Sequence, residues 1–199
     1  MTPLIAAAVG AAGWTASEYL IHRFLGHEWA KRRNFFSVEH VRHHATTSYF
    51  APTSLKAQAA VLTAAAVAPL ARRALGASAG LAFTGGFVAM YVTYEVLHRR
   101  AHTHPPTGRY GRWLRRHHFH HHFAEPKMNH GVTSPVFDYV FRTHRTPPGK
   151  IRVPARHAMT WLVDDAGEVR PEHAADYEVV AKGKPPAAET SVSAAPRPA

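Results

Sequence analysis

The segment ALGASAGLAFTGGFVAMYVTYEVLHRRAH, residues 74–102, joins a long apolar run to two histidines four positions apart. Up to Leu97 the only charged side chain in it is that of Glu95. At about 1.5 Å per residue the apolar part forms a helix of roughly 36 Å, enough to cross a hydrocarbon core of about 30 Å. The segment therefore predicts a membrane-spanning helix that ends in His98 and His102.

Two other apolar runs predict further helices. Residues 3–21 carry a single charge near their end and predict a helix of roughly 28 Å that spans the bilayer. We expect this helix to be retained, because its start lacks the basic residues of a signal peptide; a buried helix of a soluble bundle is the alternative. Residues 57–71 predict a helix of only about 22 Å. With Pro69 inside it and Arg72 and Arg73 after it, this helix is expected to enter the bilayer only partly, as half of a hairpin.

The composition narrows the kind of partner. The chain of 199 residues has no cysteine, which excludes disulfides and thiolate metal sites, and a net charge of +11. Such a charge suits nucleic acid or anionic lipid headgroups. No nucleic-acid recognition motif is present and the basic residues flank apolar runs. A lipid bilayer is therefore the expected partner, and nucleic acid is not.

The basic residues also predict an orientation. They concentrate in the polar segments 22–56 and 98–150. One span followed by a hairpin puts both segments on the same side of the membrane, and the positive-inside rule makes that side cytoplasmic. The predicted location is a membrane, expected to be a bacterial inner membrane, with the polar segments in the cytoplasm.

The histidines cluster in these same segments. Of 17 histidines, 14 lie within residues 22–44 and 98–130. Their spacings are H-x4-H from His22, H-x2-HH from His40, H-x3-H from His98 and H-x2-HH from His118. Positions i, i+3 and i+4 share one helix face, so three groups present their rings together. The first pair, five apart, is expected where a helix opens and ends, at Gly26.

Imidazoles are ligands for iron, zinc, copper and nickel. Ten of them exceed what one ion can use while it keeps open positions for a substrate. The spacings therefore predict a dinuclear site made mainly of histidine. Taken alone, the tract HHFHHH (117–122) is equally consistent with adventitious metal binding.

The motifs EYLIHRFLGH (18–27), EHVRHH (39–44), YEVLHRRAH (94–102) and HHFHHHFAEPKMNHGVTSPVFDYVF (117–141) together resemble the fatty acid hydroxylase/sterol desaturase superfamily of membrane di-iron oxygenases. Members of that family carry the same four histidine spacings, followed by G-V-T-S…D-x-x-F. The piece GVTSPVFDYVF is most similar to the fatty-acid 2-hydroxylase branch.

The resemblance implies ten metal ligands: His22, His27, His40, His43, His44, His98, His102, His118, His121 and His122. His117 and His120 are alternative ligands, because a frame that starts at His117 also satisfies the last motif. Glu18, Glu95 and Asp138 are candidates for orienting the ligands. A carboxylate commonly orients a metal-binding imidazole by accepting a hydrogen bond from the ring nitrogen that does not bind the metal. Acidic residues within membrane spans are also usually functional.

The expected fold is all-α: an integral membrane helical bundle with a cytoplasmic, histidine-rich helical cap that holds the dinuclear site. Residues 1–150 form the hydroxylase-like domain. Residues 151–181 form a small extension with a hairpin expected at 161–169, where a turn at 165–167 separates two apolar stretches. Residues 182–199, rich in Pro, Ala and Ser, are expected to be a disordered tail.

The implied function is O2-dependent hydroxylation or desaturation of an unactivated C–H bond in a fatty acyl or sterol-like lipid. Two iron ions are the implied cofactors, and zinc can replace them in purified protein. Larger family members carry a fused haem domain, which this protein is expected to lack, so the expected electron donor is a separate cytochrome- or ferredoxin-type protein. The alternatives are a carotenoid ring hydroxylase and a non-enzymatic zinc-binding membrane protein.

Overall fold

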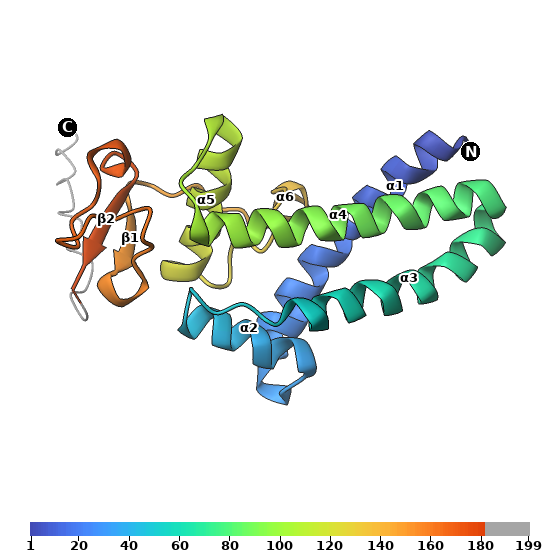
Figure 1. Ribbon diagram of the computed structural model, residues 1–199, viewed down its shortest axis with the longest axis horizontal. Coiled ribbons are helices and arrows are strands. Elements are labelled where there is room, and N and C mark those ends of the chain that lie inside the picture. Colours follow the sequence, from blue (N-terminus) through green and yellow to red (C-terminus); the bar gives the residue numbers. More distant parts are fainter. Residues whose placement is uncertain (182–199) are drawn as a thin grey trace, which may run out of the picture.

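Three long helices dominate the computed structural model, which describes residues 1–181 (Figure 1). Helix α1 (Pro3–Leu20) continues directly into a π-helix (Ile21–Glu28). Helices α3 (Thr53–Leu75) and α4 (Ala77–Thr103) form a hairpin that turns at Gly76, whose φ of 83° lies in the left-handed region. The predicted tail 182–199 lies outside the described residues.

All three helices are long and apolar enough to cross a membrane. Their surfaces support this, because large apolar side chains point outward without protein cover: Leu4 is 82% exposed, and Leu62 and Leu70 are each 70% exposed. In water such a surface would be a liability, whereas in lipid it is solvated. The predicted length of the second helix was wrong. The helix starts before residue 57 and ends after residue 71, so its 23 residues suffice for a span.

Helices α1 and α4 cross in close contact because glycines face backbone at the crossing. A Cβ added at Gly10 would lie 2.0 Å from the carbonyl oxygen of Phe83, and one added at Gly86 would lie 2.0 Å from that of Ala7. Small residues of this kind let membrane helices approach until their backbones touch. The crossing brings the end of α1 beside the last turns of α4.

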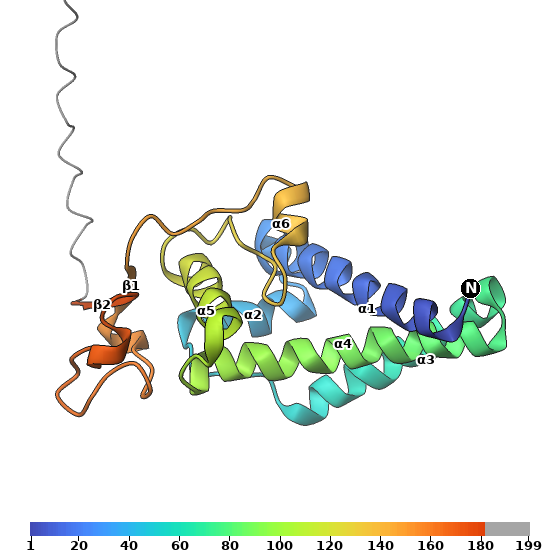
Figure 2. The ribbon, with the colours of Figure 1, turned by 90° about the horizontal axis from the view of Figure 1, so that it is seen from above.

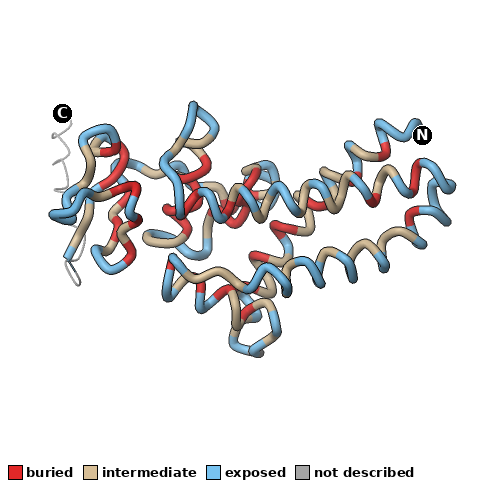
Figure 3. Tube along the Cα trace, in the orientation of Figure 1, coloured by how far each residue is buried: buried red, intermediate tan, exposed pale blue. Residues whose placement is uncertain are grey.

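The cap beyond the long helices contains three shorter ones, α2 (Phe35–Ala45), α5 (Gly108–Phe123) and α6 (Val136–Val140). Asn34 caps α2, with its side chain accepting a hydrogen bond from the amide of Ser37. Figure 2 shows α2 and α5 between the long helices and the C-terminal strands, on the side opposite the Gly76 turn, with α6 beside α1. Buried residues gather in this end and become sparse along the long helices (Figure 3).

The C-terminal segment forms a small unit on α5. Strands β1 (Ile151–Pro154) and β2 (Tyr177–Val180) pair in parallel, with Ile151 opposite Tyr177. Their buried side chains pack with Leu162 and Trp161 against Phe119 of α5. The hairpin expected at 161–169 reduces to one antiparallel bridge between residues 163 and 169. The strands come from the two ends of the segment, where Ile151, Val153 and Tyr177 are buried.

Candidate metal centre

Ten buried or half-buried histidines converge in two groups where the cap meets the long helices. Cluster A contains His22, His27, His40, His44 and His121, and cluster B contains His43, His98, His102, His118 and His122. Within each cluster one ring nitrogen of every residue lies within 4.8 Å of all the others. These are the ten histidines that the motifs single out. The predicted helical bundle with a histidine-rich cap and two metal-binding groups is confirmed.

Both H-x2-HH motifs are divided between the clusters. Helix α2 sends His40 and His44 to cluster A and His43 to cluster B, whereas α5 sends His121 to cluster A and the other two to cluster B. The rings of His44 and His122 stack between the clusters, with centroids 4.0 Å apart and planes 10° apart. Each of these helices therefore positions ligands for both clusters.

The pair His22 and His27 is brought together by the π-helix. In this geometry backbone hydrogen bonds run from residue i to i+5, as from the amide of Trp29 to the carbonyl of Phe24 (2.7 Å). Residues five apart then share a side, which places both rings in cluster A. The expectation that Gly26 ends the helix was wrong. A Cβ there would lie 3.0 Å from Cδ2 of His40, so the glycine makes room for a cluster ring.

The inward nitrogens outnumber the protons that could join them in hydrogen bonds. Nε2 of His27 lies 3.0 Å from Nε2 of His121 and 2.8 Å from that of His40. In cluster B the Nε2 atoms of His102 and His118 are 2.9 Å apart. A neutral imidazole has a single N–H, and Nε2 of His22 and of His44 is buried with no hydrogen-bond partner among residues 1–181. A set of convergent, unpaired lone pairs fits a metal cation in each cluster.

Backbone carbonyls set which nitrogen faces inward. Nδ1 of His22 donates to the carbonyl of His130, Nδ1 of His121 to that of Met128 (2.7 Å), and Nδ1 of His43 to that of Tyr49 (2.8 Å). Because Nδ1 carries the proton, Nε2 presents its lone pair to the cluster. The sequence did not reveal these partners, since carbonyls belong to every residue type.

The environment keeps the cap rings neutral. Burial lowers the pKa of His43 to about 4, and it holds the pKa values of His118 and His121 well below the ordinary range. In the last two, neighbouring imidazoles lower the pKa further. At neutral pH these rings are therefore unprotonated, which is the form that binds a metal.

Neither of the acids within the spans binds a histidine ring. The carboxylate of Glu18 accepts hydrogen bonds from the amides of Val132 and Thr133 and from the hydroxyl of Thr133 (2.7 Å). Glu95 forms an ion pair with Lys56. The expectation that these carboxylates orient imidazoles directly was therefore wrong. Glu18 instead fixes the GVTS loop, which follows the carbonyl that holds His22.

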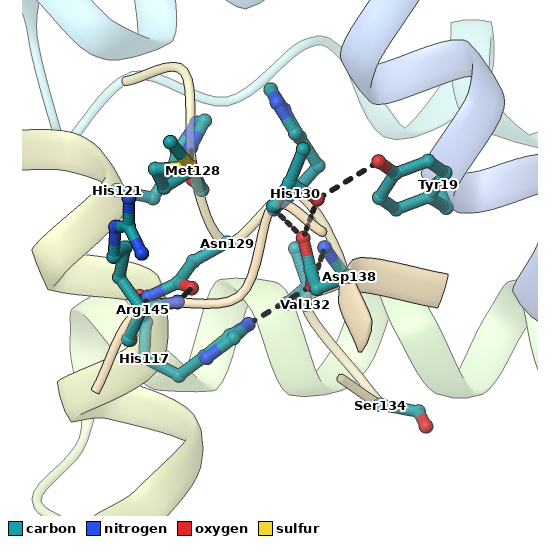
Figure 4. A network of polar contacts seen from close by, with 12 residues as sticks. Tyr19, His117, His121, Met128, Asn129, His130, Val132, Ser134, Asp138 and Arg145 are labelled. Carbon is teal, nitrogen blue, oxygen red and sulfur yellow. Dashed lines mark hydrogen bonds and ion pairs between the residues drawn. The ribbon is translucent and has the colours of Figure 1, made fainter. Parts of the chain in front are cut away.

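Asp138 holds the start of the same loop (Figure 4). Its carboxylate accepts hydrogen bonds from the amides of His130 and Gly131, from the hydroxyl of Thr143, and from Nε2 of His117 (3.2 Å). Burial by itself would raise the pKa of Asp138, but these hydrogen bonds outweigh it and hold the pKa below its ordinary value. Asp138 thus acts on His22 through the His130 backbone.

The two alternative ligands point away from the clusters. His117 is buried against Asp138 and stacks on Trp113, with ring centroids 5.0 Å apart. His120 faces Glu125, with Nε2 3.6 Å from the carboxylate. The positions of both rings support the frame that starts at His118.

A cavity of about 230 Å³ reaches both clusters from the membrane helices. His40 of cluster A and His43 and His98 of cluster B line one part of it. Its remaining walls come mostly from apolar and aromatic side chains of α1, α2, α3, α4 and the loop before α3, among them Trp14, Phe36, Phe50, Leu55, Ala59 and Tyr94. A largely apolar space with metal-binding groups in its wall fits a hydrocarbon chain.

A family model described as fatty acid hydroxylase matches residues 7–143, which include all ten histidines. The chain belongs to the fatty acid hydroxylase family. It is accordingly an integral membrane protein, in agreement with its three apolar helices. The matched region ends before β1, so the small C-terminal unit lies outside it.

Relatives of this fatty acid hydroxylase family member include human fatty acid 2-hydroxylase, 33% identical over 143 residues, which cover 65% of this chain and 37% of that protein. Dihydroceramide fatty acyl 2-hydroxylase FAH2 of Arabidopsis thaliana is 31% identical over 150 residues, covering 68% and 59%. A solved structure described as full-length scs7p, with only the hydroxylase domain visible, is 28% identical. Its TM-score is 0.58, and the match covers 76% of this chain and 60% of that one.

Proposed function

We propose that this protein is a membrane-bound di-iron oxygenase that hydroxylates the acyl chain of a lipid. The observation that carries the proposal is the cavity, because it runs between membrane helices and ends against rings of both clusters. The names of the relatives, fatty acid 2-hydroxylase and dihydroceramide fatty acyl 2-hydroxylase, support an acyl substrate.

The ten clustered histidines would hold two iron ions, five donors to each. When bound, these ions would activate O2 with two electrons from a carrier, in the balance RH + O2 + 2e⁻ + 2H⁺ → ROH + H2O. The protein would position the acyl chain and keep the site free of water. The aromatic walls at Trp14 and Tyr94 confine the acyl chain and exclude water. The carbonyls of His130, Met128 and Tyr49 keep the rings aimed inward.

The polar end of the cavity suits an uncharged linkage. Lys56 and Glu95 pair with each other inside it, and the hydroxyl of Tyr91 donates to the carbonyl of Lys56 (3.0 Å). Because the two charges compensate, a free carboxylate would have to break the pair before it could bind Lys56. An ester- or amide-linked acyl lipid meets no such cost.

The test is product analysis under ¹⁸O2. Cells that express the wild-type chain should accumulate a lipid 18 mass units heavier than a hydroxyl-free precursor, because one labelled oxygen and no other atom is added. Cells that express His98→Ala should not. Accumulation of a desaturated lipid without the label would show that the reaction is desaturation and not hydroxylation. Products confined to carotenoid rings would overturn the assignment of an acyl substrate.

Metal identity is tested separately on protein prepared without O2. We expect about two iron ions per chain by elemental analysis. Protein that holds only zinc and oxidises no lipid after iron reconstitution would overturn the enzymatic proposal in favour of a zinc-binding membrane protein.

A further inference from the structure

A second hollow, of about 640 Å³, lies in the cap and is strongly basic. It is bounded by the first half of α5, the segment 144–150 and residues 175–176, and we call it the basic groove. Five cationic side chains and one carboxylate line it: Arg109, Arg112, Arg116, Arg145, Lys150 and Asp176. Its net charge is therefore +4, from five positive groups and one negative group.

Part of this charge serves the fold and part does not. Arg112 and Arg116 both bind Asp176, at 2.5 and 2.8 Å, and so attach the C-terminal unit to α5. Arg109 and Lys150 are exposed. Within residues 1–181, neither side chain makes an ion pair or a hydrogen bond. A small anion would call for buried, convergent donors, whereas exposed cations at a rim suit the charged surface of a protein.

The groove is connected to both clusters by short paths of covalent and hydrogen bonds. Trp113 and His117 line it and stack on each other, 5.0 Å between centroids. His117 is followed directly by His118 of cluster B. His117 also donates to Asp138, which accepts from the amide of His130, whose carbonyl in turn holds His22 of cluster A (Figure 4). One covalent route and one hydrogen-bonded route therefore lead from the groove to the two clusters.

The elements that bound the groove lie away from the Gly76 turn of the membrane-spanning hairpin. α5 and the C-terminal unit lie at the end of the molecule opposite the Gly76 turn in both views (Figures 1 and 2). We propose that the basic groove docks an acidic one-electron carrier protein of cytochrome or ferredoxin type, and that electrons enter past Trp113 and His117. This inference rests on the proposed function. Two carriers, each oxidised by one electron, would supply the two electrons of one turnover.

The experiment measures docking apart from turnover. Full-length protein in phosphatidylcholine nanodiscs is loaded with zinc, so that no oxidation occurs. Its Kd is measured for two acidic probes, a plant-type [2Fe–2S] ferredoxin and the soluble haem domain of cytochrome b5. The variant is Arg109→Glu/Lys150→Glu. The matched control is Lys31→Glu/Arg142→Glu, which makes the same change in net charge at exposed residues outside the groove.

We expect the wild type to bind at least one probe, with affinity that falls as salt rises. The groove variant should weaken that Kd by about tenfold or more, and the control by less than about twofold. In iron-loaded protein, the groove variant should accept electrons from the probe more slowly, whereas its reduction by dithionite with methyl viologen should be unchanged.

Three outcomes would overturn the inference: no binding of either probe to the wild type, equal Kd values for wild type and groove variant, or equal weakening by the control. If the groove binds anionic headgroups instead, the groove variant should retain less phosphatidylglycerol than the wild type but bind both probes as tightly. This result would also overturn the inference. Failure of lipid hydroxylation with normal probe binding would contradict only the proposed function.

Discussion

At the scale of single residues, each cluster depends on what holds the outward nitrogen of a ring. His22, His43 and His121 each donate from Nδ1 to a carbonyl, and this leaves Nε2 free for a cation. Loop backbone therefore does the orienting that is often done by carboxylates. The acids Glu18 and Asp138 act one step further out, by fixing the loop that carries the His130 carbonyl.

Neighbouring histidines on α5 should respond in opposite ways to substitution. His121→Ala removes a buried metal ligand from cluster A, so bound metal should fall from the proposed two ions per chain to about one, and the proposed hydroxylation should be lost. His120→Ala is the matched control, because that ring faces Glu125 outside both clusters. Elemental analysis of both variants checks this; equal metal content in the two would contradict the assignment.

The contact of Glu18 with the GVTS loop should affect stability and metal retention, although Glu18 itself binds no metal. Glu18→Gln keeps the size of the side chain but replaces one of the two accepting oxygens with an amide donor, opposite groups that themselves donate. Such a buried mismatch costs about 1–3 kcal/mol. We expect a lower Tm and weaker metal retention during chelator titration. Glu28→Gln, at an exposed ion pair, is the control and should leave both values nearly unchanged.

At the scale of elements, the π-helix explains why one histidine motif has a spacing that differs from the others. The i, i+3 and i+4 spacings could be predicted from the sequence, because they follow from ordinary helix geometry. The H-x4-H pair could not be placed, since a π-helix is not encoded by any local pattern in residues 21–28 and is supported here by packing against α2. The division of HH pairs between clusters likewise depends on how α2 and α5 face each other.

Enlarging Gly26 tests the role of the π-helix. The Cβ of Gly26→Val would press on Cδ2 of His40 and on Cε1 of Phe36, 3.2 Å away. Overpacking of this kind costs about 1–3 kcal/mol, and it should displace a ring of cluster A. Gly85→Val is the control, because a Cβ there has nothing within 4 Å. The Tm and the metal content should both fall for Gly26→Val only. Equal decreases in the two variants would show a general effect of substitution in a helix.

At the scale of the whole molecule, the C-terminal unit is attached to the cap by packing on Phe119 and by one carboxylate. Burial alone would raise the pKa of Asp176, but the hydrogen bond from Arg112 and the charge of Arg116 outweigh it and lower the pKa. The parallel pairing of β1 and β2 could not be predicted locally, because the strands are separated by more than twenty residues. The apolar runs of the three long helices, by contrast, could be recognised in the sequence, because many of their large apolar side chains are exposed where lipid would surround them.

The attachment through Asp176 should weaken in acid. A carboxyl group whose folded pKa is lowered contributes stability above its unfolded pKa, near 3.9, and that contribution is lost as pH falls through the folded value. Hydrogen exchange in residues 149–153 and 176–180 should therefore rise below about pH 4. Asp176→Asn should raise the same exchange at neutral pH, because it removes the negative charge that binds Arg112 and Arg116 without any acidification. Unchanged exchange in that variant would exclude the ion pair as the attachment.

The sharing of α2 and α5 between the clusters has a consequence for how the protein is loaded. Once one ion immobilises these two helices, the donors of the other cluster are already ordered, so the second ion binds without that entropic cost. Metal uptake should therefore be cooperative. Native mass spectrometry of partly reconstituted samples should show empty and doubly loaded chains, with singly loaded chains scarce.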